Sequence, residues 1–499
     1  MKYLLSNNIY TSLLILAVAF LFTVFFGYAQ TDYEFINALA HRVSLGDLPY
    51  RDFDYVRPPL SLYLHSISFK FFPDHAVIIS RIIYFFQMLF ISYLSTNILS
   101  RINYLSNLKV IPLTLIFFLL SLHNFPAMPW HTVDGLMFLV LATYLLLNGI
   151  NQNKVIYLFL AGFCCGLAAL TKQNFLLLSP FFLLFAYVSC KKRFLYILLG
   201  QVLCGLAFLL YLSQNELLSI YIENQSNKST FYSVVYSLII SLQLTSNLSL
   251  LPSMIVLGIA IFLNKNYFIE KKNIIIFPAL FFIFSSIAEL YLRNWDSYDS
   301  YTANPKIIYQ LIWISSIYYF LVNLKQISDF LNFENLILAL FFLIGISTMI
   351  SWGYPYPNLF VAPYLAILFK EFEKYFGEIN LNKVLLCSFV AWLLISNIQY
   401  RDEYKFLSSY NLGKIYPKLN FIHVGKDNFS NYQKLKNISH KYSVVSVLPD
   451  FPLFSYLNDS KSQFRADWFL DPESTSPIEK YLDGMEGKYF IVMDKCFED

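Results

Sequence analysis

The chain has 499 residues, of which 57% are hydrophobic and only 14% are charged, and its mean hydropathy is +0.52. This composition excludes a water-soluble globular fold. The net charge of +4 is too small and too dispersed to indicate a nucleic-acid partner. We therefore expect an α-helical polytopic membrane protein, because lipid offers backbone groups no hydrogen-bond partners outside a helix.

Apolar runs recur along most of the chain. A spanning helix needs about 20 mostly apolar residues, and the sequence predicts thirteen spans. They are residues 11–28, 76–98, 109–122, 133–148, 155–171, 174–189, 194–213, 247–263, 274–292, 307–323, 335–350, 358–370 and 384–398. The first run is longer than the apolar core of a signal peptide, so we expect an uncleaved anchor. The predicted membrane domain covers residues 1–399, with a first outer loop at 30–74.

Lysine and arginine gather in alternate loops, which the positive-inside rule assigns to the cytoplasm. They are Arg101, Lys109, Lys154, Lys191, Lys192, Arg193, Lys265, Lys271, Lys272, Lys325, Lys374 and Lys383. The first loop and the C-terminal tail, from about residue 400 onward, then face outward. The stretch 231–263 is too long for one ordinary helix, so we assign 231–243 to a helix on the outer surface and 247–263 to the span. Two short spans there would move the tail to the cytoplasm.

The first outer loop is rich in carboxylates for so apolar a chain. Asp32 directly follows the first span, where partial desolvation raises the basicity of a carboxylate, so it is a candidate general base. The alternative is that Asp32 only caps a following interfacial helix. Glu34 lies two residues further and would point in a different direction on such a helix.

A second cluster in this loop, at residues 49–60, ends at two prolines. Pro58 disfavours helical geometry at Arg57 and holds the guanidinium group on an extended segment. An arginine fixed there suits a phosphate at the level of the lipid headgroups. The alternatives are an interface residue that reaches toward water, or an ion-pair partner of Asp52 or Asp54.

Three further polar residues are predicted at the outer ends of later spans. Asp134 opens the fourth span and is a functional candidate, although helix capping would explain it too. Lys172 follows the fifth span, where a positive charge is not expected, and either contacts a phosphate or extends to water. His131 is a candidate metal ligand beside Asp134, but a lone histidine is more often a hydrogen-bonded interface residue.

From about residue 400 the chain becomes polar, which predicts a small soluble α/β domain over 400–499. Residues 442–448 and 488–494 have the β-branched and aromatic content of strands. The Pro-Asp-Phe-Pro sequence at 449–452 is a turn signal, and the residues between the strands can supply a helix. The six cysteines show no metal-binding or redox spacing, so we interpret them as packing residues.

Several of these motifs resemble those of the GT-C membrane glycosyltransferases. The resemblance rests on Asp32 after the first span, GDLPYRD at 46–52, RPPL at 57–60, Asp134, and GLAALTK at 166–172. The nearest likeness is to the branch of protein O-mannosyltransferases and lipid A aminoarabinose transferases. Those enzymes take a sugar from a polyprenyl-phosphate carrier on the outer face of the membrane, and the predicted spans and outer tail resemble the aminoarabinose transferase layout.

The resemblance also implies residue roles. Asp32 matches the catalytic carboxylate of the first loop. Asp134 matches the second-loop carboxylate and is the second candidate catalytic residue, which could orient the acceptor or bind a divalent ion. Arg57 and Lys172 match basic residues that contact the carrier phosphate. One departure is that many relatives have Asp-Glu in sequence, whereas here Tyr33 stands between the two acidic residues.

Other polar side chains of the same outer mouth become candidate substrate contacts. They are Glu34, Asp52, Tyr55 and His131. A divalent metal ion is the one cofactor considered, but the carboxylates are too scattered in sequence to assign its ligands. The sequence has no glycine-rich phosphate loop, and a lipid-linked donor needs no nucleotide-binding fold.

The expected activity is transfer of a hexose or pentose, with inversion, from a polyprenyl-phosphate carrier to a lipid, glycan or protein acceptor. The expected place is a bacterial inner membrane, with the site facing outward. One alternative is a transporter or flippase of lipid-linked glycans, which would carry charges midway along its helices and often internal repeats. The other is an O-antigen polymerase or ligase, in which the large functional loop comes late in the chain.

Overall fold

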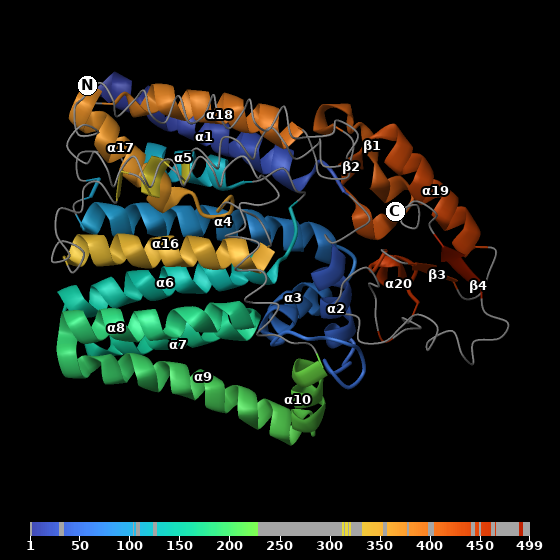
Figure 1. Ribbon diagram of the computed structural model, residues 1–499. Helices are drawn as coiled ribbons and strands as arrows, with labels where there is room; N and C mark the ends of the chain where they lie inside the picture. Colours follow the sequence, from blue (N-terminus) through green and yellow to red (C-terminus); the bar gives the residue numbers. More distant parts are fainter. Residues whose placement is uncertain are drawn as a thin grey trace, which may run out of the picture.

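Long helices that run side by side make up most of the computed structural model (Figure 1). It describes residues 2–28, 34–102, 104–105, 110–122, 127–227, 312–313, 315–317, 319–320, 332–352, 357–376, 379–397, 404–440, 445–448, 451–460, 465 and 489–492. The helices of the bundle are α1 (Lys2–Val24), α4 (Ala76–Arg101), α5 (Val110–Ser121), α6 (His131–Asn151), α7 (Val155–Thr171), η2 (Gln173–Leu178), α8 (Ser179–Cys190), η3 (Lys191–Arg193), α9 (Phe194–Gln214), α16 (Phe333–Trp352), α17 (Ala362–Phe376) and α18 (Leu381–Asn397).

Four described helical stretches are long and apolar enough to cross a membrane, judged by length and composition. They are Ala76–Arg101, His131–Asn151, Gln173–Gln214 and Phe333–Ser351. Ten of the thirteen predicted spans coincide with described helices. The runs 247–263 and 274–292, together with the surface helix expected at 231–243, lie outside the described residues, and 307–323 is described only in part. The total of thirteen spans therefore stays a prediction.

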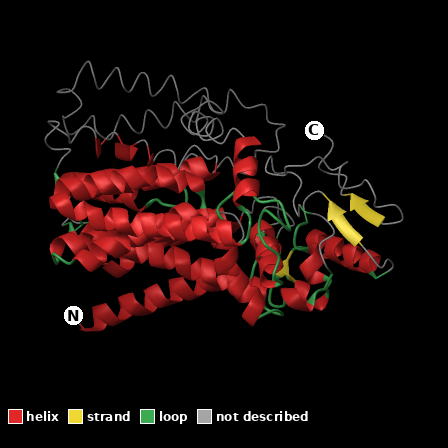
Figure 2. Cartoon of the chain, turned by 90° about the horizontal axis from the view of Figure 1, so that it is seen from below, coloured by secondary structure: helices red, strands yellow, loops and turns green. Residues whose placement is uncertain are grey.

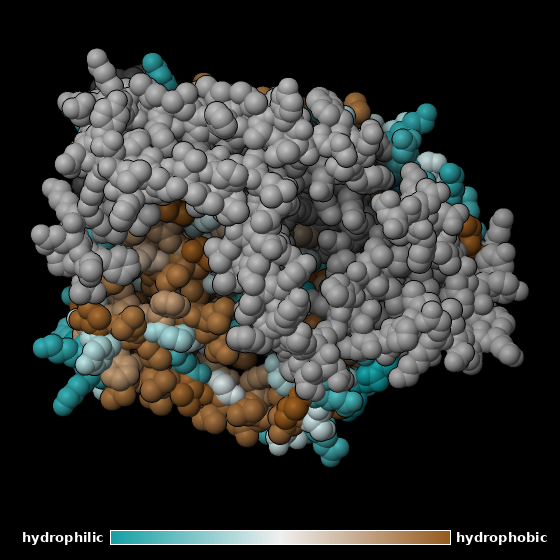
Figure 3. All heavy atoms as spheres, viewed as in Figure 1, coloured by the Kyte–Doolittle hydropathy of each residue, from teal (hydrophilic) through white to brown (hydrophobic). Residues whose placement is uncertain are grey.

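Apolar side chains face outward from the edge of the bundle. Large hydrophobic residues along α9, such as Leu199, Leu206 and Leu210, are more than half exposed, and the lower part of Figure 3, where α9 lies, is correspondingly apolar. A water-soluble protein rarely exposes so continuous an apolar surface. This face is what a helix bordering lipid requires, and it agrees with the expected integral membrane protein.

Glycines let α7 and α9 approach closely. A Cβ atom on Gly162 would lie 2.0 Å from the carbonyl oxygen of Ile197, and one on Gly200 would lie 2.4 Å from that of Phe159. In lipid, helices associate through such close packing, because burying an apolar side chain against another helix gains little over burying it in lipid tails.

The first loop and the tail lie at the same end of the bundle, as the predicted topology requires (Figures 1 and 2). The loop contains α2 (Phe35–Ser44) and α3 (Leu60–Phe71), and α10 (Leu218–Asn227) lies nearby. The N-terminus and the junction of α8 with α9, which carries Lys191–Arg193, lie at the opposite end. Which end faces outward stays a prediction.

In its described residues, the tail combines short helices with four short strands. Its elements are η6 (Lys405–Leu407), β1 (Tyr410–Asn411), η7 (Leu412–Lys414), η8 (Pro417–Leu419), β2 (His423–Val424), α19 (Lys426–Ser439), β3 (Val445–Leu448), α20 (Phe454–Leu457) and β4 (Tyr489–Val492). β1 and β2 are antiparallel, and β3 and β4 are parallel. The two predicted strands, 442–448 and 488–494, thus contain β3 and β4. The domain boundary at residue 400 stays a prediction.

A buried arginine closes the end of α1. Arg81, on α4, is 2% exposed and donates hydrogen bonds to the carbonyl oxygens of Thr23 (3.1 Å), Val24 (2.6 Å), Phe26 (2.9 Å) and Gly27 (2.8 Å). The last carbonyls of a helix have no partner within it, and leaving them unpaired in an apolar interior is costly. Arg81 therefore satisfies the end of α1 and the turn that follows it.

Replacing Arg81 by methionine should lower the free energy of unfolding by about 3 kcal/mol or more, because it leaves several buried carbonyl groups without donors. The matched control is Arg101→Met at the other end of α4, where an exposed guanidinium donates to the side chains of Asn148 and Tyr144 (2.9 Å to the Tyr144 hydroxyl) and to no backbone carbonyl in the described structure. That control should cost less than about 1 kcal/mol. Unfolding of both variants in detergent micelles measures the difference, and equal losses would rule out the capping role.

Candidate active site

The candidate site begins where α1 ends. Residues 29–33, which include the predicted base Asp32, lie outside the described residues. The residues on either side are placed: Tyr28 is 1% exposed and Glu34 is 3% exposed. In sequence, Asp32 therefore stands between two positions that are both buried.

Glu34 stands at the N-terminus of α2 and accepts a hydrogen bond from Asn37 Nδ2 at 3.0 Å. Burial raises the pKa of Glu34 to about 7, although the bond from Asn37, the positive charge of Arg81 and the Tyr28 hydroxyl all favour its charged form. Desolvation outweighs these effects, because the free energy that a carboxylate loses on leaving water is larger than the free energy it regains from a few hydrogen bonds. Near neutral pH, Glu34 is thus protonated in a large share of the molecules.

Changing Glu34 to glutamine should remove a pH dependence of stability. The folded-state pKa of about 7 lies above the ordinary value of 4.5, so the stability contribution is fully present below the ordinary value and is lost as pH rises through the folded value. The wild-type melting temperature should fall between about pH 5 and about pH 8, by an amount equivalent to about 3 kcal/mol at most.

The Glu34→Gln variant keeps an acceptor for Asn37 and should show a much smaller fall. Glu223→Gln, at an exposed position of α10, is the control and should titrate like the wild type. Equal pH profiles for wild type and Glu34→Gln would show that Glu34 does not carry the raised pKa.

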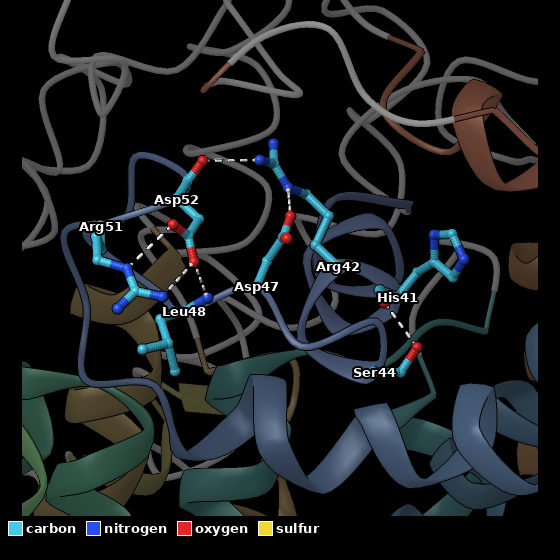
Figure 4. Close-up of polar contacts among 7 residues, drawn as sticks. All are labelled: His41, Arg42, Ser44, Asp47, Leu48, Arg51 and Asp52. Carbon is cyan, nitrogen blue, oxygen red and sulfur yellow. Dashed lines mark hydrogen bonds and ion pairs between the residues drawn. The ribbon is translucent and has the colours of Figure 1, made fainter. Parts of the chain in front are cut away.

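Two further acidic residues of the loop, Asp47 and Asp52, hold the turn after α2 (Figure 4). Arg42 pairs with Asp47 at 3.0 Å and donates to the carbonyl oxygen of Asp52 at 2.8 Å. The Asp52 carboxylate accepts from the backbone N–H of Leu48 at 2.7 Å and from Arg51 at 3.1 Å. The bond from Arg51 holds the pKa of Asp52 below its ordinary range. Asp52, a predicted substrate contact, is therefore engaged in holding the turn.

Aromatic rings surround the segment that leads to Arg57. Tyr50 and Tyr55 are buried, with ring centroids 6.2 Å apart, and Tyr55 also lies 6.4 Å from the ring of Phe35. Arg57 is 8% exposed, its guanidinium lies 5.8 Å from the centroid of the same Phe35 ring, and its carbonyl accepts from the Tyr50 hydroxyl at 2.6 Å. Tyr55, another predicted contact, is thus part of the packing near Arg57.

His131, Arg57 and Lys172 come together although they lie in three separate parts of the chain. His131 is the first residue of α6, is fully buried and stacks on Trp130 with centroids 4.7 Å apart. The positive charges of Arg57 and Lys172 both act on the His131 ring. Neither ring nitrogen of His131 has a hydrogen-bond partner among the described residues. Two cations therefore act on a buried imidazole whose ring nitrogens are available as hydrogen-bonding groups as far as the described residues go.

Lys172 is held at the C-terminus of α7 in an extended conformation, with φ −157° and ψ 132°. Its amine donates to the carbonyl oxygen of Ser351 in the last turn of α16, and the Ser351 hydroxyl in turn contacts that of Thr132. A cation near the C-terminus of a helix is favourable because the helix dipole is negative there. This contact fixes Lys172 beside the start of α6.

Asp134 lies one turn along α6 from His131 and is fully buried. Its carboxylate lies 3.1 Å from His65 Nε2 of α3 and accepts from Gln87 Nε2 of α4 at 2.7 Å. These bonds join three helices behind the loop. Sequence reasoning did not select His65, Gln87 or Arg81, although each is a polar residue within a largely apolar stretch, which is the signal that points to such residues.

Within the part of the chain that the structure describes, no three His, Cys, Asp or Glu side chains lie close enough to hold a metal ion. His65 and Asp134 form a pair, which is fewer ligands than Zn²⁺, Ca²⁺ or Mg²⁺ normally takes. The divalent ion considered from the sequence therefore stays a prediction.

No family model and no curated protein matches this sequence. Among solved structures, the chain is similar to an oligosaccharyltransferase from Archaeoglobus fulgidus. The match to AglB in complex with an inhibitory peptide and a dolichol-phosphate has a TM-score of 0.40 at 14% identity, over 78% of this chain and 54% of that one. The apo form gives 0.41 at 13% identity, over 78% and 55%. The form tethered to an acceptor peptide gives 0.40 at 14%, over 78% and 54%. The chain spans about half the length of the archaeal protein.

Proposed function

We propose that the protein is an inverting membrane glycosyltransferase of the GT-C type that takes a sugar from a polyprenyl-phosphate carrier. The observation that carries this proposal lies at the end of the bundle that holds the first loop. There the positive charges of Arg57 and Lys172 act on a buried His131 whose ring nitrogens have no hydrogen-bond partner among the described residues. Two cations beside an unused buried imidazole form a site whose chemistry suits an anion.

Each of the three groups suits a phosphate in a different way. The planar guanidinium of Arg57 can donate two parallel hydrogen bonds, while the amine of Lys172 acts as a compact positive charge. A neutral His131 has one N–H that can donate to a third oxygen. In a buried site these interactions are stronger than in water, and they strengthen further as the leaving phosphate gains charge in the transition state.

Asp32 is the proposed general base. As the acceptor hydroxyl oxygen bonds to the anomeric carbon, its proton passes to the Asp32 carboxylate and the bond from that carbon to the phosphate oxygen breaks. A single displacement of this kind inverts the anomeric centre. Glu34, two residues further along the chain, has a pKa raised by burial to about 7 and therefore carries less negative charge near neutral pH than an ordinary carboxylate.

Asp134 has a positioning role in this proposal. Its contacts with His65 and Gln87 hold α3, α4 and α6 in register, and α3 begins three residues after Arg57. Fixing α3 therefore limits how far the Arg57 guanidinium can move. Rigid support of this kind is what a site needs if its charges are to meet a developing negative charge without rearranging.

The transporter alternative predicts charged residues along a pathway through the helices. The described helices do contain Arg81 and Asp134 in their interior, but each is engaged by several hydrogen bonds near one end of the bundle. Such contacts favour a structural role for these two residues over a role in a transport pathway. The acceptor, whether lipid, glycan or protein, the outward orientation and the bacterial inner membrane belong to the same proposal, as does any divalent ion.

The proposal is tested with purified protein and a panel of radiolabelled polyprenyl-phosphate sugars, hexosyl and pentosyl. Asp32→Asn should lower the rate of sugar release from its carrier by about 100-fold or more, because general-base catalysis contributes on that order. The control is Asp74→Asn, an exposed carboxylate after α3 in the same loop, which should leave the rate unchanged. Undiminished release by a folded Asp32→Asn protein would contradict the assignment.

A further inference from the structure

The tail reaches back to the first loop through a single arginine. Arg465 Nε lies 3.1 Å from Asp54 Oδ1, and Arg465 Nη2 donates to the carbonyl oxygen of Tyr50 at 2.9 Å. The backbone N–H of Asp54 donates in return to the carbonyl oxygen of Arg465 at 2.8 Å. Three contacts from one residue fix both the side chain and the backbone of this short stretch of the loop.

Tyr50 links this contact to the proposed phosphate site. It is fully buried, has a φ of +73°, and its hydroxyl donates to the carbonyl oxygen of Arg57 at 2.6 Å. A positive φ is unfavourable for a bulky residue and persists only where the surroundings hold it. Arg465 donates to the backbone carbonyl of Tyr50, and the Tyr50 hydroxyl donates to the backbone carbonyl of Arg57. Tyr50 therefore links the tail to Arg57.

We propose that Arg465 is a positioning residue for Arg57, and that the tail thereby forms part of the donor-phosphate site. This inference rests on the proposed function. The tail sets the conformation at Tyr50, and the Tyr50 hydroxyl fixes the backbone of Arg57 immediately before the two prolines. Loss of the Arg465 contact would let this segment relax and move the guanidinium away from the phosphate.

A second set of contacts ties the tail to the other side of the site. The backbone N–H of His423 donates to the carbonyl oxygen of Phe25 at 2.8 Å, and the carbonyl oxygen of His423 accepts from the N–H of Gly27 at 2.9 Å. The rings of Tyr28 and Tyr432 lie 5.8 Å apart. The tail thus holds the chain just before Asp32 as well as the chain before Arg57, which is expected if it helps to build the site.

The test measures binding of undecaprenyl phosphate to the full-length protein in lipid nanodiscs. The variants are Arg57→Ala, Arg465→Asp, Asp54→Arg, the exchange that combines the last two, and Tyr50→Phe. Tyr50→Phe removes only the hydroxyl bond to Arg57 and keeps the aromatic packing. The matched control is Asp459→Asn, which weakens the Lys418–Asp459 ion pair elsewhere in the tail. Melting temperatures confirm that each variant is folded.

We expect Arg465→Asp and Asp54→Arg each to weaken binding about tenfold. The exchange should recover part of the loss, because it restores opposite charges at these positions but not the bond to the Tyr50 carbonyl. Tyr50→Phe should weaken binding about threefold, and adding Arg465→Asp to it should cost less than the two separate effects combined, since both act through one connection. Asp459→Asn should bind like the wild type. A merely structural role for Arg465 would lower the melting temperature without this pattern of recovery.

These variants test the phosphate site and the positioning role of Arg465 separately. If Arg57→Ala binds undecaprenyl phosphate as tightly as the wild type, the proposed phosphate site is wrong and the role of Arg465 falls with it. If Arg57→Ala loses binding while Arg465→Asp and Tyr50→Phe do not, the phosphate site stands and the positioning role of Arg465 is overturned.

Discussion

The need to satisfy the carbonyl groups at the end of α1 governs how the site is built. A helix that ends inside an apolar bundle leaves carbonyl oxygens without donors, and water is not available to replace them. Arg81, on a neighbouring helix, supplies donors for two of these oxygens and for two more in the turn that follows. The chain can therefore turn at a buried position, and the residues that follow α1 enter the loop from a fixed point.

Arg81 also affects Glu34, the residue at the N-terminus of α2. Its charge favours the charged form of Glu34, yet burial still raises the pKa of Glu34 to about 7, so the interior here carries less negative charge than the sequence suggests. The tail then adds hydrogen bonds on both sides, through His423 at the end of α1 and Arg465 at the turn after α2. Loop, bundle and tail are thus joined by hydrogen bonds around the proposed site.

Long apolar runs predicted the described helices of the bundle well, because a spanning segment must be long and apolar whatever it contacts. The topology deduced from it also placed Arg57, Asp134 and Lys172 at one end of the bundle, where the structure has them. Contacts between residues far apart in sequence could not be predicted in this way. Asp52 was interpreted as a substrate contact, which stays a prediction. A single sequence does not reveal that its carboxylate also accepts hydrogen bonds from Arg51 and Leu48 and so holds a turn. The bond between Arg465 and Tyr50 joins residues too distant in sequence for any local pattern to indicate it.

The central claim is that Arg57, Lys172 and His131 hold the phosphate of a polyprenyl carrier. A cryo-EM structure of the protein with bound undecaprenyl phosphate tests it most directly. The account predicts phosphate oxygens about 3 Å from the Arg57 guanidinium, the Lys172 amine and one ring nitrogen of His131. A phosphate bound elsewhere, with both His131 nitrogens still enclosed by protein atoms alone, would contradict it.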